Sequence, residues 1–179
     1  FIIIDECCET TNKNIFAIGD VAGGIQLAHK ATKEAKIAAS KILDESSLVL
    51  DDFVIPAVVF TDPEISWVGL TEKEAKSDNI PVSVSKFPWS ASGRALTLNR
   101  TEGMTKIISD PDTGRLLGIG IVGDHAGDLI SEAALAIQSG MTVDDLAETI
   151  HPHPTLSESL MESAEHALGF CTHLVPSKR

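Results

Sequence analysis

The sequence predicts an α+β fold for most of the chain, with an antiparallel sheet covered by helices. Beyond residue 51, strand-like and helical runs do not alternate strictly, which is typical of a layered α+β domain. Two of these runs are joined by the turn sequence Asp110-Pro-Asp-Thr-Gly114, as expected for an antiparallel hairpin. The pattern changes near residues 45–56, where Asp51, Asp52 and Pro56 stand. We therefore expect two parts, residues 1–50 and residues 51–179.

Two strands and one helix are expected in the first part, residues 1–50. Residues 2–4 and 15–18 are short apolar runs of the kind found in buried strands. Gly19, Asp20, Gly23 and Gly24 follow as a turn. A helix is expected over residues 26–43, because small apolar residues recur there as one narrow stripe suited to packing on a sheet.

Five strands and four helices are expected in the second part, residues 51–179. Thr71 and Glu74 have the spacing of a capping box, and Thr142 is placed to cap a later helix. Gly140 and Gly169 stand where helices are expected to stop. The strands are expected at residues 57–60, 64–69, 82–87, 104–109 and 115–122, and the helices at residues 71–77, 126–139, 143–149 and 156–168.

Charge and cysteine content exclude several classes of protein. The net charge is −12, which argues against nucleic-acid binding because that needs clustered cations. No apolar stretch is long enough to span a membrane, and no secretion leader is visible. The three cysteines, Cys7, Cys8 and Cys171, have no disulfide or zinc-site spacing, so we expect reduced thiols. The opening FIIID reads as the middle of a strand, so we expect further residues upstream in the parent protein.

The strand that ends in Gly19-Asp20 predicts a ligand contact. Ligands of open α/β sheets bind beyond the carboxyl ends of the strands, and a carboxylate there accepts hydrogen bonds from sugar-type hydroxyls. The helix that follows directs its free N–H groups and positive dipole end to the same region, which favours a negatively charged ligand. The alternative is a tight turn in which Asp20 only caps the backbone.

The segment HPHPTLSE at residues 151–158 predicts an acid/base pair. Pro152 and Pro154 keep the residues before them extended, so His153 stands rigidly before a helix that begins near Thr155. Glu158 lies in the first turn, from which its carboxylate can reach back, hold one tautomer of the imidazole and raise its basicity. Two alternatives remain: Thr155 and Glu158 also have capping-box spacing, and the two histidines could bind a metal, although no metal site is expected because further ligands at convincing spacing are missing.

Both motifs resemble those of the flavoprotein disulfide reductases. HPHPTLSE resembles most closely the C-terminal signature of the dihydrolipoamide dehydrogenases, and three further stretches resemble their interface domain: PAVVFTDPEISWVG, KFPWSASGRA and GDLISEAALAIQSG. The resemblance covers essentially the whole chain. It implies that residues 1–50 are the tail of an α/β FAD-binding domain and residues 51–179 the dimerisation domain. It assigns FAD contacts to Asp20, Gln26, Leu27, Ala28 and His29.

The resemblance also implies a reaction and its participants. His153 would be the acid/base of thiol–disulfide exchange, oriented by Glu158, with a cis peptide bond to Pro154. The parent enzyme would oxidise dihydrolipoamide with FAD and NAD, as a homodimer. Its partner would be the lipoyl domain of a 2-oxo acid dehydrogenase complex or a glycine cleavage system. It would act in the bacterial cytoplasm or, in a eukaryote, the mitochondrial matrix.

The residues also differ from the complete family pattern. The redox cysteine pair, the GxGxxG segment for the FAD pyrophosphate and the NAD-binding unit are not found in residues 1–179, so the chain alone is expected to be inactive. Two alternatives stay open at this point. The chain could serve only as a dimerisation module, or it could belong to a related reductase of the glutathione or mercuric type.

Overall fold

A computed structural model describes residues 1–44, 49–50 and 53–174. The chain forms two compact units, Phe1–Ile55 and Pro56–Arg179, each treated by itself below. Parts of the boundary predicted at residues 45–56 lie outside the described residues. None of the helices described is both long enough and apolar enough to cross a lipid bilayer.

Among its described residues, the first unit contains the helix α1 (Ala28–Ile42), preceded by irregular chain and the 3-10 turn η1 (Gly19–Ala22). The strands predicted at residues 2–4 and 15–18 are wrong, since these runs make only the isolated bridges Ile4 to Thr10 and Glu9 to Phe16. Most of their apolar side chains are exposed. The apolar pattern is that of strands buried inside a sheet, and the described residues of this unit supply no neighbouring strands to complete one.

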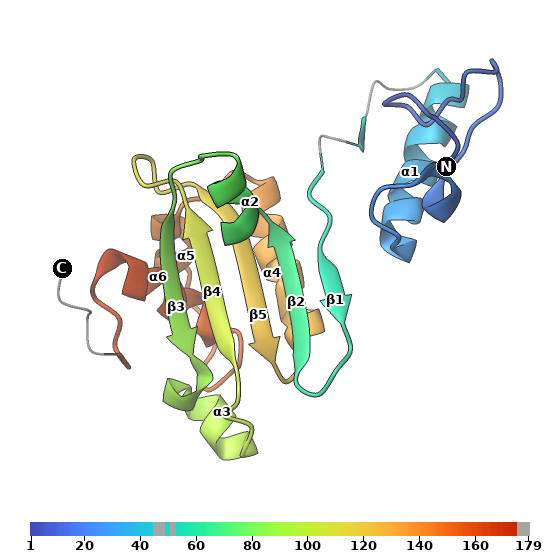
Figure 1. Cartoon of the computed structure of the whole chain (residues 1–179). Helices are drawn as coiled ribbons and strands as arrows, with labels where there is room; N and C mark the ends of the chain where they lie inside the picture. Colours follow the sequence, from blue (N-terminus) through green and yellow to red (C-terminus); the bar gives the residue numbers. More distant parts are fainter. Residues whose placement is uncertain (45–48, 51–52, 175–179) are drawn as a thin grey trace. The chain divides into compact units, whose positions relative to one another are not determined.

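The second unit is built on one five-stranded antiparallel sheet (Figure 1), which confirms the predicted α+β fold. Its strand order is β1-β2-β5-β4-β3, so the hairpin β4–β5 lies inside the sheet. The expected strand at residues 57–60 is observed at Ala57–Val59, and the others agree within one residue at each end. The strands are β1 (Ala57–Val59), β2 (Glu64–Gly69), β3 (Ser83–Pro88), β4 (Met104–Ser109) and β5 (Leu116–Gly123).

Helices cover one face of this sheet. The helix α4 packs on β1, β2 and β5, and α6 packs on β3 and β4, while α5 packs beside α6. In Figure 1 these three helices lie behind the sheet, and only α2 stands before the other face. The helical elements are α2 (Glu72–Ser77), η3 (Trp89–Ala91), α3 (Gly93–Leu98), α4 (Ala126–Gln138), α5 (Val143–Glu148) and α6 (Glu158–Leu168).

The predicted local signals are present. Thr71 and Glu74 form a capping box, as do Thr142 and Asp145. The turn between β4 and β5 is held by Asp110, whose Oδ1 accepts the backbone N–H of Thr113 at 2.7 Å. The helix α3 was missed because it has only six residues and begins with glycine, although Ser92 as its N-cap and the left-handed Asn99 at its end are local signals.

Candidate active site

The acid/base pair predicted from HPHPTLSE is assembled in the structure. Nδ1 of His153 lies 2.9 Å from Oε1 of Glu158, and the His153–Pro154 peptide bond is cis. A carboxylate only accepts hydrogen bonds, so Nδ1 donates to it and Nε2 is left as the nitrogen that can take up a proton. The His153 imidazole is 71% exposed and Glu158 only 16%, so the carboxylate is covered while the imidazole is accessible to solvent.

Glu158 also serves the helix terminus, although only one half of the capping box suggested by its spacing from Thr155 is formed. Its Oε2 accepts the backbone N–H of Thr155 at 2.7 Å, which is one half of a capping box. The Thr155 hydroxyl instead donates to the carbonyl of Pro152 at 2.8 Å and closes the loop before the helix. Each carboxylate oxygen therefore has one task, and the helix starts at Glu158 rather than near Thr155 as expected.

A buried hydrogen-bond chain holds the first turn of α6 against the sheet. Nε1–H of Trp89 donates to Oγ1 of Thr105 at 3.0 Å, and the Thr105 hydroxyl donates to Oγ of Ser159 at 2.8 Å. All three side chains are inaccessible to solvent or nearly so. Ser159 follows Glu158 directly, so this chain fixes the position of the orienting carboxylate. The sequence analysis missed it because the three residues are far apart along the chain.

His151, the first histidine of the motif, anchors the segment 151–158 to the helix α4. Nε2 of His151 lies 2.6 Å from Oε1 of Glu132 on α4, and Nδ1 lies 2.8 Å from the carbonyl oxygen of Thr149. The hydrogen bond to Glu132 raises the pKa of His151, and burial opposes this only in part. The imidazole is 4% exposed, so it holds the segment in place and does not act on a substrate. The sequence analysis gave His151 no role except in the alternative in which both histidines bind a metal.

In the first unit, the predicted FAD contacts lie around the start of α1. Asp20 is exposed within η1, and Gln26, Ala28 and His29 are exposed around the helix start. Leu27 is the N-cap residue of α1, and its apolar side chain makes no capping hydrogen bond to the helix terminus. The exposed carboxylate of Asp20 and the N-terminus of α1 therefore lie in one short segment, as the sequence predicted.

A buried ion pair fixes this segment. Nζ of Lys30 lies 2.6 Å from Oε1 of Glu34, with exposures of 5% and 1%. The other oxygen of Glu34 accepts the backbone N–H of Gly19 at 2.7 Å, and Lys30 donates to the carbonyl of Gly23 at 2.9 Å. The pair therefore holds both ends of the turn that carries Asp20. The sequence analysis missed it, although the spacing of four residues on a helix was a signal.

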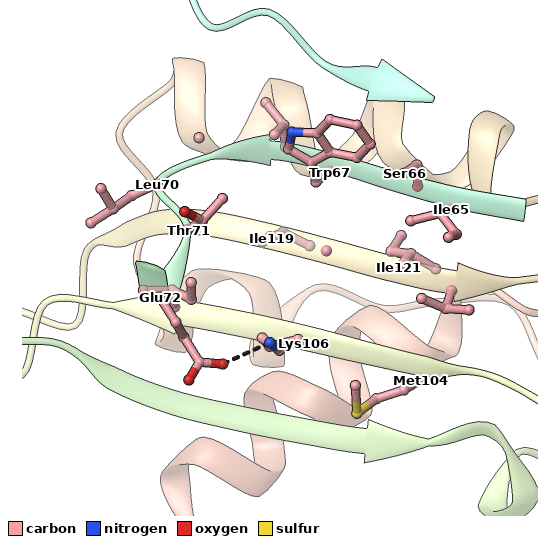
Figure 2. A pocket seen from close by; sticks show the side chains of 15 residues that line it. Ile65, Ser66, Trp67, Leu70, Thr71, Glu72, Met104, Lys106, Ile119 and Ile121 are labelled. Atoms are coloured by element: carbon pink, nitrogen blue, oxygen red, sulfur yellow. Dashed lines mark ion pairs between the residues drawn. The ribbon is translucent and has the colours of Figure 1, made fainter. Parts of the chain in front are cut away.

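The face of the sheet opposite α4 and α6, called the uncovered face although α2 stands before part of it, carries a hollow lined largely by apolar side chains (Figure 2). Trp67 pairs with Gly120, and Gly120 pairs with Lys106 on its other side. A side chain at Gly120 would meet only the carbonyl oxygen of Ser66, at 3.9 Å, so the glycine leaves a cavity of about 200 Å³ between its neighbours. At one border of the hollow, Nζ of Lys106 forms an ion pair with Oε1 of Glu72 at 2.6 Å. Ile65, which also lines the hollow, is 41% exposed.

Comparison with known proteins agrees with this geometry. The family model described as pyridine nucleotide-disulphide oxidoreductase, dimerisation domain, matches residues 55–164, and a pyridine nucleotide-disulphide oxidoreductase model matches residues 1–35. A dihydrolipoyl dehydrogenase of Halobacterium salinarum is 51% identical over 94% of this chain and 35% of its own length. One from Thermus scotoductus is 53% identical over 92% of this chain and 35% of its own length.

Solved structures give the same result. LpdA from Mycobacterium tuberculosis matches with a TM-score of 0.85 and 31% identity, over 92% of this chain and 36% of that one. The HOCl-induced flavoprotein disulfide reductase RclA from Escherichia coli matches with a TM-score of 0.84 and 32% identity, over 91% of this chain and 38% of that one. The chain thus spans little more than a third of the proteins it matches. The resemblance inferred from the motifs is confirmed: the chain belongs to the pyridine nucleotide-disulphide oxidoreductase family and contains its dimerisation domain.

Proposed function

We propose that the chain is the C-terminal part of a dihydrolipoamide dehydrogenase and supplies the acid/base of its thiol–disulfide exchange. The observation that carries the proposal is the pairing of His153 with Glu158, with Nδ1 bound to the carboxylate and the accessible side of the ring free to exchange a proton. Relatives named dihydrolipoyl dehydrogenase support this substrate over glutathione- or mercuric-type substrates. The reaction requires the remainder of the parent enzyme, since the chain spans only part of those relatives.

In this mechanism Nε2 of His153 takes the proton of a dihydrolipoyl thiol. The resulting thiolate attacks one sulfur of the enzyme's disulfide, a mixed disulfide forms, and the second enzyme sulfur leaves as a thiolate. The second lipoyl sulfur then attacks the first, which closes the lipoamide ring, and its proton passes to the first enzyme sulfur as that sulfur leaves. Glu158 keeps Nδ1 protonated and stabilises the imidazolium while it carries the proton. The cysteine pair itself is assigned by the family resemblance to a part of the enzyme outside residues 1–179.

The cofactor segment fits the FAD that the family uses. Asp20 offers an exposed carboxylate that can accept from ribityl hydroxyls, and Gln26, Leu27, Ala28 and His29 stand at a helix start open to the flavin ring. FAD held by these residues would supply the two-electron chemistry that links the cysteine pair to NAD. The chain's own part is to hold the ring: Lys30 and Glu34 fix the turn, and the positive end of α1 favours negative charge near it.

We also propose a homodimer that uses the uncovered sheet face. The apolar hollow beside Trp67, on the face of the sheet opposite α4 and α6, supports this proposal, because exposed apolar patches mark interaction surfaces. In the assembled enzyme the exposed His153 would face the flavin side of the partner subunit. The lipoyl domain of a 2-oxo acid dehydrogenase complex or of the glycine cleavage system would deliver the substrate. Free thiols at all three cysteines suit the bacterial cytoplasm or the mitochondrial matrix.

Two experiments on the full-length enzyme test these proposals. His153→Ala is expected to lower NAD-linked turnover of dihydrolipoamide by about 10²–10⁴-fold, the usual contribution of a positioned acid/base. His125→Asn is the control, because His125 is an exposed histidine of the same unit with a left-handed backbone that asparagine tolerates. Loss of only a few fold in His153→Ala contradicts the role.

The dimer face is tested by sedimentation. Trp67→Glu is expected to shift the protein toward the monomer, because it places a charge in the apolar hollow. Leu135→Glu is the matched control, since Leu135 is 66% exposed on the helical side of the sheet. A Trp67→Glu protein that remains as dimeric as the control contradicts the assigned face.

A further inference from the structure

A second histidine is bound to a carboxylate of α6 in the same way as His153. Nδ1 of His173 donates to Oε1 of Glu162. This bond repeats that of His153, whose Nδ1 donates to Oε1 of Glu158. Glu162 lies four positions after Glu158, so the two carboxylates lie on one face of the helix in successive turns. The His173 side chain is 51% exposed and that of Glu162 only 5%, so this pair also combines a covered carboxylate with an accessible imidazole.

The Glu162 carboxylate is fixed through its other oxygen as well. The thiol of Cys171 donates to Oε2 of Glu162 at 2.8 Å. Burial and this hydrogen bond raise the pKa of Cys171 to about 11, so the thiol keeps the proton that it donates at neutral pH. A carboxylate only accepts hydrogen bonds, so Nδ1 of His173 carries a proton and Nε2 of the neutral ring is left as an acceptor.

Both histidines line the same cavity, which has a volume of about 150 Å³. Its apolar wall is formed by Phe87 of β3, Ala91 of η3 and Leu96 of α3. Pockets for drug-sized molecules usually measure about 300–1,000 Å³, so this cavity admits the end of a ligand and not a whole one. The ligand that fits it has a short apolar body and two groups that can each donate a hydrogen bond to an imidazole nitrogen.

We propose that this cavity binds the dithiol end of the substrate and that Nε2 of His173 accepts a hydrogen bond from the second thiol. The inference rests on the proposed function, in which Nε2 of His153 takes the proton of the first thiol. The dihydrolipoyl group has the required form, because it carries two S–H donors on one short hydrocarbon chain.

His173 is on this account a specificity-determining residue. It forms no covalent bond and retains no proton, so the proton balance of the reaction is unchanged. A dithiol held by both imidazoles presents its first sulfur to His153 in one orientation. A monothiol gains only one of the two hydrogen bonds and is bound less well.

The test is rapid mixing of the oxidised full-length enzyme with dihydrolipoamide over a range of concentrations, which separates binding from chemistry. In His173→Ala the concentration that gives half the limiting rate should rise about 2–10-fold, the usual effect of one hydrogen bond, while the limiting rate is unchanged. His173→Gln should recover much of this loss, because its amide oxygen is an acceptor. His125→Asn, at another exposed histidine of this unit, is the control and should change neither quantity.

A second variant tests the apolar wall. Leu96 is 58% exposed, so Leu96→Ala removes part of the wall at little cost to the fold. The concentration for half the limiting rate should rise several fold in this variant too. Leu135→Ala is the matched control, since Leu135 is 66% exposed and lies outside the cavity.

The outcomes separate this inference from the proposed function. A His173→Ala protein that binds dihydrolipoamide as the wild type does, while His153→Ala is slow, overturns the inference alone. So does a lower limiting rate at unchanged half-saturation, or a glutamine variant no better than alanine. A wild-type enzyme that dihydrolipoamide does not reduce, or a His153→Ala protein as fast as wild type, overturns both.

Discussion

Oε1 of Glu158 lies 2.9 Å from Nδ1 of His153, and the other oxygen of the same carboxylate caps the turn at Thr155. One side chain therefore orients the imidazole and starts the helix on which it is itself carried. Preorganisation of this kind is what an acid/base needs, because a ring that wandered would lose the geometry of proton transfer.

If Glu158 acts only through His153, the two substitutions will not add. In the full-length enzyme Glu158→Gln is expected to reduce turnover less than His153→Ala does. The double variant should be no slower than His153→Ala alone, as for residues that work as a unit. Steady-state kinetics of the three variants provide the cycle. A double variant slowed by the product of the two single effects would show independent roles.

Thr105→Val tests the support beneath this pair. Valine keeps the volume but removes the acceptor of the Trp89 N–H and the donor to Ser159, leaving buried polar groups unpaired. The free energy of unfolding should fall by about 1–3 kcal/mol, measured by urea denaturation. Turnover of the full-length variant should also fall several fold while it is still folded. Thr97→Val, at an exposed position on α3, is the control and should change neither quantity.

The contact between His151 and Glu132 predicts a pH dependence of stability. The pKa of His151 is raised in the folded protein, so its contribution is complete below the unfolded pKa near 6.5 and is lost as the pH rises through the folded pKa. His151→Gln should cost about 1–3 kcal/mol at pH 5–6, and the difference from wild type should shrink at higher pH. Urea denaturation across a pH series measures it. A difference that grows as the pH rises would reverse the sign and disprove the assignment.

Lys30→Met tests the ion pair beneath the cofactor segment. It leaves the Glu34 carboxylate buried without its cation, at a cost of about 3–5 kcal/mol, and releases the turn that carries Asp20. The full-length variant should retain less FAD after gel filtration, measured by flavin absorbance per chain. Lys36→Met, at an exposed position of the same helix, is the control. Equal flavin content in both variants would contradict a positioning role.

The dimerisation domain was predictable because its signals are local. The capping box at Thr71, the helix cap at Thr142 and the turn at Asp110 each lie within a few residues, and the structure confirms them. The strands predicted at residues 2–4 and 15–18 failed for the opposite reason. An apolar run indicates a buried strand only when neighbouring strands are present to bury it, and among the described residues of the first unit they are not.

The same distinction separates the site residues that could be found from those that could not. His153 and Glu158 are five positions apart within one motif, so their contact could be predicted. His151 meets Glu132 on another helix, and Trp89 reaches the first turn of α6 through Thr105. Contacts of that kind depend on how helices pack on the sheet, which the pattern of one segment does not contain.

The central claim is tested most directly by rapid mixing of the oxidised full-length enzyme with each of its two reductants. In His153→Ala, reduction by dihydrolipoamide should slow by about 10²–10⁴-fold, because the lipoyl thiol loses its proton acceptor. Reduction by NADH should keep its rate, because hydride transfer does not need this imidazole. Equal slowing of both reactions, or of neither, would contradict the role given to His153.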